Sequence, residues 1–205
     1  RVVLHPVTIP EGYSLTQIAE VLAAQQVTYT KEFTKLVRDR TFISTLGIEA
    51  DSLEGYLFPE TYSFAKGTKA REVIKAMVDG LHRVWGTELQ EQAARMKMSL
   101  HQVLTLASVI EKETGAKHER ELIAAVFHNR LRKKIPLQSD PTVIYGLPAF
   151  DGNIHKRDLS VMSPYNTYRV QGLPPGPIAS PGAHSLRAAL FPAQASYLYF
   201  VSRND

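Results

Sequence analysis

The chain has 205 residues, enough to bury a hydrophobic core in one large or two small domains. It contains no cysteine, which excludes a disulfide-stabilised scaffold and a cysteine nucleophile, and no apolar run approaches the ~20 residues that cross a bilayer. The net charge of +4 suits a polyanionic partner, but Lys and Arg form no tract with interleaved aromatics, which argues against nucleic acid.

The first fifty residues predict a small α+β module. Residues 2–9 are rich in β-branched side chains and favour a strand, which Pro6 places at a sheet edge or a break. Ser14 with Gln17 has the spacing of a capping box and predicts a helix, and Thr30 is expected to cap a second helix. Residues 41–51 are expected to form a polar connection.

The next segments predict an edge strand and then helices. Residues 53–64 carry aromatics and Thr that favour extended structure, and Pro59 within them indicates an edge strand or a kink. A long helical region is expected to start at Thr68, with an interruption near Gly86.

A further helix is predicted to begin after Ser99, because Gln102 again completes a capping-box spacing. One line along this helix is apolar until its last member, which is a carboxylate: Leu100, Leu104, Ala107 and Glu111. Gly115 is the expected C′ residue of the helix. A helix that ends its buried stripe with Glu needs a partner or a task for that Glu, since burial of an unpaired carboxylate is costly.

Two interpretations of this carboxylate remain open. The negative end of the helix dipole and partial desolvation should raise the pKa of Glu111, and a carboxylic acid protonated near neutral pH can act as a general acid. Glu113, on a different line of the helix, has the next best claim. The structural alternative is an ion pair with Arg120 or Arg130, which the helix pattern alone favours, because single carboxylates near helix ends are common.

The remainder of the chain becomes rich in loops. Residues 117–134 predict one more helix, and after Ile135 frequent Pro, Gly, Asn and Tyr residues predict long connections. Asp140 followed by Pro141 predicts the start of a short helix within this region. Residues 197–201 predict a closing strand.

Two loop segments contain candidate ligand-binding side chains. Gln138 and Tyr145 carry an amide and a phenol that can bind sugar hydroxyls and acetamides at the rim of a groove. Residues 164–168 place two aromatics and an Asn beside turn signals in a similar way. The structural alternative is equally strong, because Tyr clusters also fill hydrophobic cores.

Other common sites lack their signatures. The seven His residues are scattered and form neither HExxH nor a close pair at ligand spacing, so no metal site is predicted. A Walker loop, a GxGxxG turn and a GxSxG elbow are all absent from the sequence, which leaves phosphate, dinucleotide and serine-hydrolase functions without support.

Taken together, several segments in order resemble the endolytic murein transglycosylase, or YceG-like, family. The matching segments are EGYLFPETY (54–62), ASVIEKET (107–114), AVFHNRL (125–131), LQSDPTVIYG (137–146), YNTY (165–168), GLPPGPI (172–178) and YLYF (197–200). The resemblance implies an α+β fold with two parts. These are a LysM-like subdomain over residues 1–47, which is a peptidoglycan-associated module, and a catalytic domain over residues 48–205.

The resemblance also implies a reaction. Such enzymes cut the β-1,4 bond between N-acetylmuramic acid (MurNAc) and N-acetylglucosamine (GlcNAc) without water and leave a 1,6-anhydro-MurNAc end. One Glu acts first as acid and then as base toward the muramic C6 hydroxyl, so the paired carboxylates of most glycosidases are not needed. The resemblance assigns this role to Glu111 and makes Gln138, Tyr145, Asn166 and Tyr168 candidates for positioning the glycan. It implies no cofactor and no metal.

Family members normally carry an N-terminal transmembrane anchor and continue beyond the last predicted strand. The resemblance therefore implies a periplasmic or extracellular part of a protein anchored in the bacterial inner membrane. It also implies that part of the active-site wall lies outside these 205 residues. The implied partners are peptidoglycan glycan strands and peptidoglycan synthases (penicillin-binding proteins), beside which the family is reported to work.

Two other functions remain open. The first is a non-catalytic peptidoglycan-binding module. The second is a pyridoxal-phosphate lyase of aminodeoxychorismate, a name sometimes attached to the family, which needs a Schiff-base Lys and a phosphate cup. Lys112 and Lys156 are available, but no Gly-rich phosphate-binding turn accompanies them.

Overall fold

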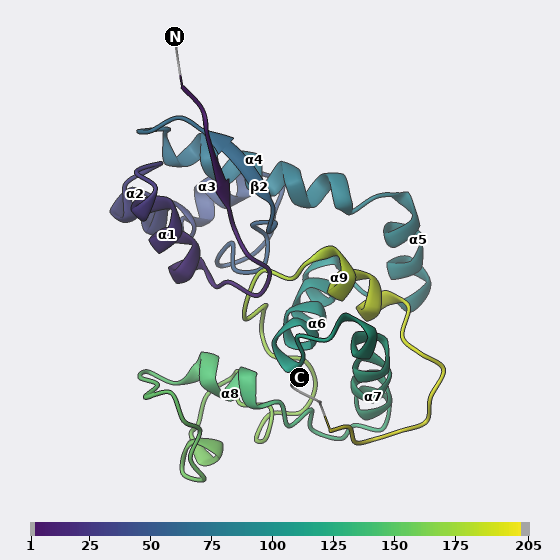
Figure 1. Ribbon diagram of the computed structural model, residues 1–205. Helices are drawn as coiled ribbons and strands as arrows, with labels where there is room; N and C mark the ends of the chain where they lie inside the picture. The colour runs from purple at the N-terminus through teal and green to yellow at the C-terminus, as the bar shows by residue number, and fades with distance from the viewer. Residues whose placement is uncertain (1–2, 202–205) are drawn as a thin grey trace. The chain divides into compact units, whose positions relative to one another are not determined.

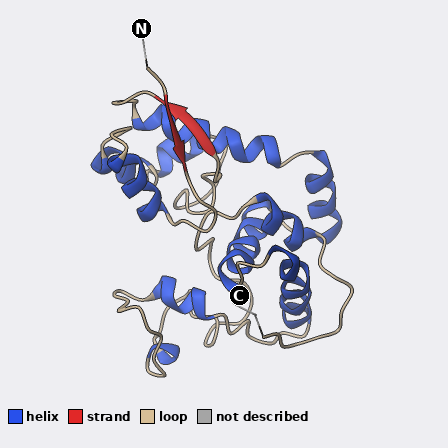
Figure 2. Cartoon of the chain, in the orientation of Figure 1, coloured by secondary structure: helices blue, strands red, loops and turns tan. Residues whose placement is uncertain are grey.

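The computed structural model describes residues 3–201 (Figure 1). It is mostly helical, and the described part of the chain contains one two-stranded antiparallel sheet, so the fold is α+β in the broad sense (Figure 2). The chain divides into two compact units, one formed by residues 1–90 with 179–182 and the other by residues 91–178 with 183–205. The LysM-like subdomain ending at residue 47 stays a prediction.

The first unit contains the sheet and four helices. Strand β1 (His5–Thr8) pairs with β2 (Thr61–Phe64), so that Val7 lies opposite Tyr62. Both strands of a two-stranded sheet are edges, which explains why Pro6 is tolerated. The helices are α1 (Leu15–Ala24), α2 (Thr30–Leu36), α3 (Arg40–Thr45) and α4 (Ala70–Val84).

The helix after Ser14 is confirmed, because the hydroxyl of Ser14 and the amide of Gln17 form the predicted capping box. The polar connection expected over residues 41–51 is wrong in part. Asp39 accepts hydrogen bonds from two backbone N–H groups and starts α3, whose Phe42 is buried. Only residues 61–64 of the extended segment form a strand, and the described turns before them bury Leu53 and Leu57 instead.

The second unit is built on three helices that pack together: α6 (Leu100–Glu113), α7 (Arg120–Arg132) and α9 (Ala183–Leu190). Helix α5 (Thr87–Met96) leads into the unit, and a 3₁₀ turn, η1 (Lys117–Glu119), precedes α7. Helix α8 (Asp140–Gly146) and the turn η2 (Asp158–Ser160) interrupt the long loops (Figure 1). None of the described helices combines the length and apolar composition needed to span a bilayer.

Helix α6 starts as predicted, with Ser99 and Gln102 in a complete capping box. At its end Thr114 is the C-cap in extended geometry, and Gly115 follows at the predicted C′ position but without a left-handed backbone conformation. The Thr114 hydroxyl donates to the carboxylate of Glu119 at 2.8 Å and accepts the N–H of Ala116, so hydrogen bonds of this side chain, and not a left-handed glycine, order the turn after the helix.

The strand expected over residues 197–201 is wrong. Side chains of α7 donate hydrogen bonds to backbone carbonyls of this segment, and no strand among the described residues pairs with it. Asn129 donates to the carbonyls of Ala195 and Tyr197 at 2.8 Å each. The segment therefore lies along α7 as an irregular chain, which is the arrangement that completes the site described below.

Candidate active site

The two carboxylates at the end of α6 lie in different surroundings. The Nη2 of Arg120 donates to Oε1 of Glu111 at 2.5 Å, and the two side chains are only 4% and 5% exposed. This is the ion pair that the sequence left open as the structural interpretation of Glu111. The role of Glu111 as the acid stays a prediction.

Glu113, one half-turn further along, faces a cavity of about 260 Å³ in the second unit. We call this cavity the Glu113 groove; it is lined by Glu113, Arg130, Leu137, Gln138, Asp140, Tyr168, Tyr199 and Phe200. The lining comes from the end of α6, from α7, from residues 137–140, from Tyr168 and from the segment that follows α9. The groove thus combines a carboxylic acid with an amide, a guanidinium and aromatic rings.

The surroundings of Glu113 favour its protonated form. Burial raises the pKa of this carboxyl above its usual range, and the negative charge of Asp140 acts in the same direction. The hydroxyl of Ser139 donates to Oε1 of Glu113 at 2.5 Å and opposes the shift. Because burial is the largest effect, the net pKa is raised, as a general acid near neutral pH requires.

Arg130 holds the groove together from α7. It is buried and donates to the carbonyls of Leu198, Pro136 and Leu137 at 2.7 to 3.1 Å. Its Nη1 also donates to Oε1 of Gln138 at 3.1 Å, and its guanidinium lies 4.9 Å from the ring centre of Tyr199. One cation on α7 therefore joins the nearby turn at residues 136–138 to the distant segment at residues 198–199.

Two of the four predicted glycan-positioning residues lie in the groove. Gln138 adopts a left-handed backbone conformation with φ of 52°, which is costly for a residue with a side chain. Hydrogen bonds to Thr167 hold this turn, from the N–H of Gln138 to the carbonyl and from the N–H of Ser139 to the hydroxyl. The phenol of Tyr168 donates to Oδ1 of Asp140 at 2.6 Å.

The other two predicted residues do not line the groove. Asn166 is fully buried, and its amide donates to the carbonyls of Leu159 and Val161 while its Oδ1 accepts the N–H of Tyr168. Tyr145 lies in α8 against the ring of Tyr165, with centroids 4.8 Å apart. A direct role for either in glycan positioning stays a prediction, and the observed bonds give Asn166 a part in fixing Tyr168.

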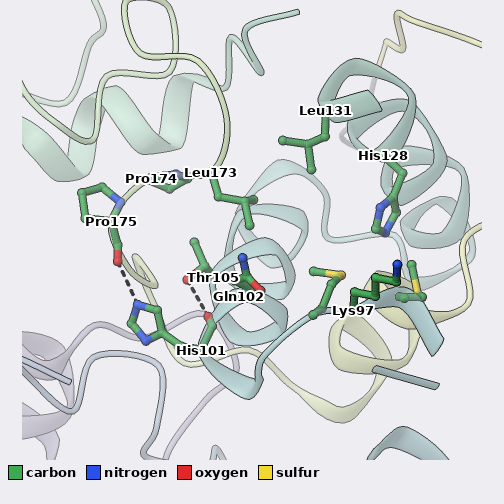
Figure 3. Close-up of a pocket in the computed structure, with 11 residues that line it drawn as sticks. Lys97, His101, Gln102, Thr105, His128, Leu131, Leu173, Pro174 and Pro175 are labelled. Carbon is green, nitrogen blue, oxygen red and sulfur yellow. Dashed lines mark hydrogen bonds between the residues drawn. The ribbon is translucent and has the colours of Figure 1, made fainter. Parts of the chain in front are cut away.

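A larger cavity of about 510 Å³ lies at the beginning of α6 (Figure 3). Its lining residues in the described chain include no carboxylate: Met96, Lys97, Met98, His101, Gln102, Thr105, His128, Leu131, Leu173, Pro174 and Pro175. His101 and His128 each place Nε2 against a backbone carbonyl, at 2.8 and 2.7 Å, and burial lowers the pKa of His128. This cavity has no carboxyl group among its described lining residues, whereas the surroundings of Glu113 favour a protonated carboxyl group, so the Glu113 groove is the better candidate.

The sequence contained signals for some of the missed residues. Asp140 was singled out only as a helix start, and Arg130 only as a potential partner of Glu111. Both lie within the segments that carried the family resemblance. Ser139, Tyr199 and Phe200 gave no individual signal, because their roles depend on contacts over 26 residues or more, such as the bond from Ser139 to Glu113.

Comparisons with known proteins agree with the resemblance. The model of the YceG-like family matches residues 2–205. The chain is 41% identical over 214 residues to a protein named endolytic murein transglycosylase from Bacillus subtilis (strain 168), covering 97% of this chain and 59% of that protein. It is 34% identical over 226 residues to a protein of the same name from Streptococcus pneumoniae (strain ATCC BAA-255 / R6), covering 98% of this chain and 41% of that protein.

A crystal structure of a yceG-like protein from Listeria monocytogenes is similar throughout. Its TM-score to this structure is 0.87 at 39% sequence identity, and the match covers 97% of this chain and 70% of that one. The chain therefore spans between two fifths and three fifths of the two named relatives, and most of the solved one. Because the family model covers nearly every residue, the chain belongs to the YceG-like family.

Proposed function

We propose that this chain is the catalytic part of a lytic transglycosylase that cuts peptidoglycan glycan strands internally. The bond cut is the β-1,4 link between MurNAc and GlcNAc, and the product carries a 1,6-anhydro-MurNAc end. The family membership and the names of the relatives support the class of substrate. The observation that carries the chemistry is Glu113, a carboxyl group of raised pKa in a groove with sugar-binding side chains.

In the proposed reaction protonated Glu113 gives its proton to the glycosidic oxygen, and the bond from that oxygen to C1 of MurNAc breaks. The positive charge that develops at C1 is quenched when O6 of the same sugar attacks. The Glu113 carboxylate takes the proton of the C6 hydroxyl during this attack, which closes the anhydro ring and restores the acid. The raised pKa keeps Glu113 protonated for the first step, in which it donates a proton. In the second step the resulting carboxylate accepts a proton, so one residue acts first as an acid and then as a base.

The other side chains that line the groove have different roles in this proposal. The amide of Gln138 and the phenol of Tyr168 can bind sugar hydroxyls and acetamides, and the ring of Tyr199 can lie against a sugar face. Arg130 fixes the turn that carries Gln138 and the segment that carries Tyr199. This division leaves one acid/base residue and several positioning residues, as expected where the nucleophile is part of the substrate.

We propose Glu113 in preference to Glu111, which the sequence resemblance had selected. A general acid must reach the leaving oxygen, and Glu113 lines the groove whereas Glu111 is held in a buried ion pair with Arg120. Both residues lie in the segment 107–114 that carries the resemblance, although the resemblance itself selects Glu111. The experiment below includes both.

The same reasoning gives the proposed setting. An enzyme of this class acts in the bacterial cell envelope on nascent glycan strands, and a membrane anchor and peptidoglycan synthases as partners belong to the same proposal. A peptidoglycan-binding module without activity is the competing function, and it would use the same groove without needing an acid.

The test is mass spectrometry of products released from uncrosslinked glycan strands by the wild type, Glu113→Gln and Glu111→Gln. We expect 1,6-anhydro ends from the wild type and a loss of roughly 10²-fold or more in Glu113→Gln, the usual contribution of a general acid. Glu111→Gln should keep measurable activity once its folded fraction is accounted for. An inactive Glu111→Gln that is fully folded, beside an active Glu113→Gln, would return the acid role to Glu111. Strand binding without any product from the wild type would favour the binding module.

A further inference from the structure

We infer that Asp140 is a second functional carboxylate of the Glu113 groove, one that positions Tyr168 and supplies negative charge to the reacting sugar. This inference rests on the function proposed above and concerns the same site. Asp140 and Glu113 both line a cavity of about 260 Å³, so a sugar whose glycosidic oxygen meets Glu113 lies in the field of Asp140.

The first observation is the bond between Asp140 and Tyr168. The phenol donates to Oδ1 of Asp140 at 2.6 Å, while the N–H of Tyr168 donates to Oδ1 of Asn166 at 3.0 Å. Burial and the nearby Asp140 both raise the pKa of Tyr168, so the phenol keeps its proton and the direction of the bond is fixed. Asp140 therefore holds one of the two predicted sugar-binding side chains that lie in the groove.

The second observation is the charge balance around Glu113. The charged and titratable groups that line the groove with it are Arg130, Asp140, Tyr168 and Tyr199. Among the described lining residues, Asp140 is the one carboxylate besides Glu113. The guanidinium of Arg130 is engaged by Gln138 and by backbone carbonyls, whereas Asp140 is exposed to solvent at the groove.

The negative charge of Asp140 has two consequences for the proposed reaction. Before the sugar reacts, it opposes ionisation of Glu113 and keeps the acid loaded with its proton. As the glycosidic bond breaks, C1 becomes positive, and a fixed carboxylate in the same cavity stabilises that charge without any covalent step. An enzyme whose nucleophile belongs to the substrate gains from such a charge, because no nucleophilic carboxylate is there to supply it.

A purely structural role for Asp140 is the competing explanation. Asp140 is the first residue of α8, where an acidic side chain is favoured by the helix dipole, and Ser139 precedes it as the N-cap. That role would be preserved in large part by any polar residue, so a folded Asp140→Asn would keep the wild-type kcat. The value of kcat therefore separates the two explanations, and the pH profile tests the charge effect of Asp140 on Glu113.

The test compares the wild type with Asp140→Asn, Tyr168→Phe and the double variant, using kcat, KM and the pH profile for anhydro-end formation. Asp140→Asn should lower kcat by roughly 10²-fold, the scale of a lost electrostatic contact to a developing charge. It should also move the alkaline limb of the profile to lower pH, because Glu113 loses its proton more easily. Tyr168→Phe should lower kcat less and leave that limb in place, and the double variant should lose less than the sum of the two.

The matched control is Asp158→Asn, which removes an acidic side chain from the start of another short helical turn, η2, outside the groove. It should leave kcat and the pH profile unchanged. A wild-type kcat and an unshifted alkaline limb in folded Asp140→Asn would overturn the role of Asp140 while leaving the proposed function intact.

A readout independent of activity tests the charge effect directly. Titration of the Glu113 carboxyl by ¹³C NMR should show a lower pKa in Asp140→Asn than in the wild type, and an identical pKa would overturn the inference. If the wild type produced reducing ends formed by hydrolysis, and no 1,6-anhydro ends, the proposed function would instead be overturned. Such hydrolytic ends would overturn the stated role of Asp140 as well, since Asp140 would then be the base that activates water.

Discussion

Glu111 and Glu113 lie two residues apart on α6, yet their carboxylates have opposite surroundings. One is held by a guanidinium and the other is buried beside a hydroxyl and a second carboxylate. A helix rotates side chains by about 200° over two residues, so neighbouring acids of one motif face different parts of the protein. Their substitutions should therefore have opposite effects on stability.

We predict that Glu113→Gln stabilises the protein at neutral pH. Because the folded state raises the pKa of Glu113, it binds the proton more tightly than the unfolded state does. The stability contributed by this group is complete below its unfolded pKa and is lost as pH rises through the folded pKa. Gln does not ionise and its Oε1 can still accept the hydroxyl of Ser139, so the variant escapes that loss.

Thermal melting of both proteins across a pH series measures this effect. The variant should melt at a higher temperature than the wild type near pH 7, and the gap should close as pH falls toward about 4, the ordinary pKa of Glu. A gap that widens in acid would mean that Glu113 is stabilised as the anion, contrary to the surroundings described here.

Glu111→Gln should have the opposite effect, a loss of about 3–5 kcal/mol in the free energy of unfolding. The substitution removes the anion from a pair whose side chains are 5% and 4% exposed, and it leaves the Arg120 charge buried. Denaturant unfolding at neutral pH measures the loss. The surface pair of Arg40 and Asp51, 75% and 82% exposed, provides the control, since Asp51→Asn should cost less than about 1 kcal/mol. Equal losses in the two variants would show that the buried pair contributes no more than an exposed one.

The sequence ranked Glu111 above Glu113, but the helix pattern is a weak basis for that ranking. Residues 103–110 of α6 are buried without a break, so both lines of the helix are core-facing and amphipathicity gives no preference. The polar residues Thr105 and Ser108 are buried too. Their hydroxyls donate to backbone carbonyls of the same helix, and Ser108 accepts the N–H of Ile178. The partner Ile178 lies in a distant loop, and its contact with Ser108 cannot be inferred from spacing along the helix.

Among the secondary-structure elements, α7 provides hydrogen-bond donors to the C-terminal segment of the chain, as a neighbouring strand would in a sheet. Three consecutive residues, His128, Asn129 and Arg130, donate to backbone carbonyls in the segment from Ala189 to Leu198. The strong strand propensity of residues 197–201 therefore has no ladder to join in the described chain. Local rules succeeded where the signal was local, as in the capping boxes at Ser14 and Ser99, and failed for this segment because its partner is a helix.

We predict that Asn129→Ala loosens the segment that carries the aromatic wall of the groove. The substitution removes the donor to the carbonyls of Ala195 and Tyr197, at a cost of about 1–3 kcal/mol for two hydrogen bonds. Tyr197 and Tyr199 are 61% and 77% exposed, so chymotrypsin can report the loosening by faster cleavage after either residue. Asn153→Ala, in an exposed loop, is the control and should not alter cleavage there. Unchanged cleavage in Asn129→Ala would show that the hydrogen bonds of His128 and Arg130 are sufficient to hold the segment in place.

On the scale of the whole molecule, neither compact unit is a continuous stretch of chain. The chain passes between them after residues 90, 178 and 182, and residues 179–182 belong to the first unit. The N–H of Ser180 donates to the carbonyl of Tyr13 at 2.8 Å, and the carbonyl of Ser180 accepts the N–H of Gly12 at the same distance. A return segment of this kind could not be predicted from sequence pattern, because backbone bonds between residues 12–13 and 180 leave no periodic signal.

We predict that Ser180→Pro destabilises the first unit even though the substitution lies about ninety residues beyond the end of its main segment. Proline has no N–H to donate to Tyr13, which costs about 1–3 kcal/mol before any steric effect. The single tryptophan of the chain, Trp85, lies in the first unit, so its fluorescence reports the loss as an earlier denaturant midpoint. Ser180→Ala keeps the N–H and removes a buried hydroxyl that has no hydrogen-bond partner among the described residues, so its midpoint should stay equal or rise. If Ser180→Pro left the Trp85 midpoint unchanged, the return segment would contribute nothing to the first unit, and that unit would consist of residues 1–90 alone.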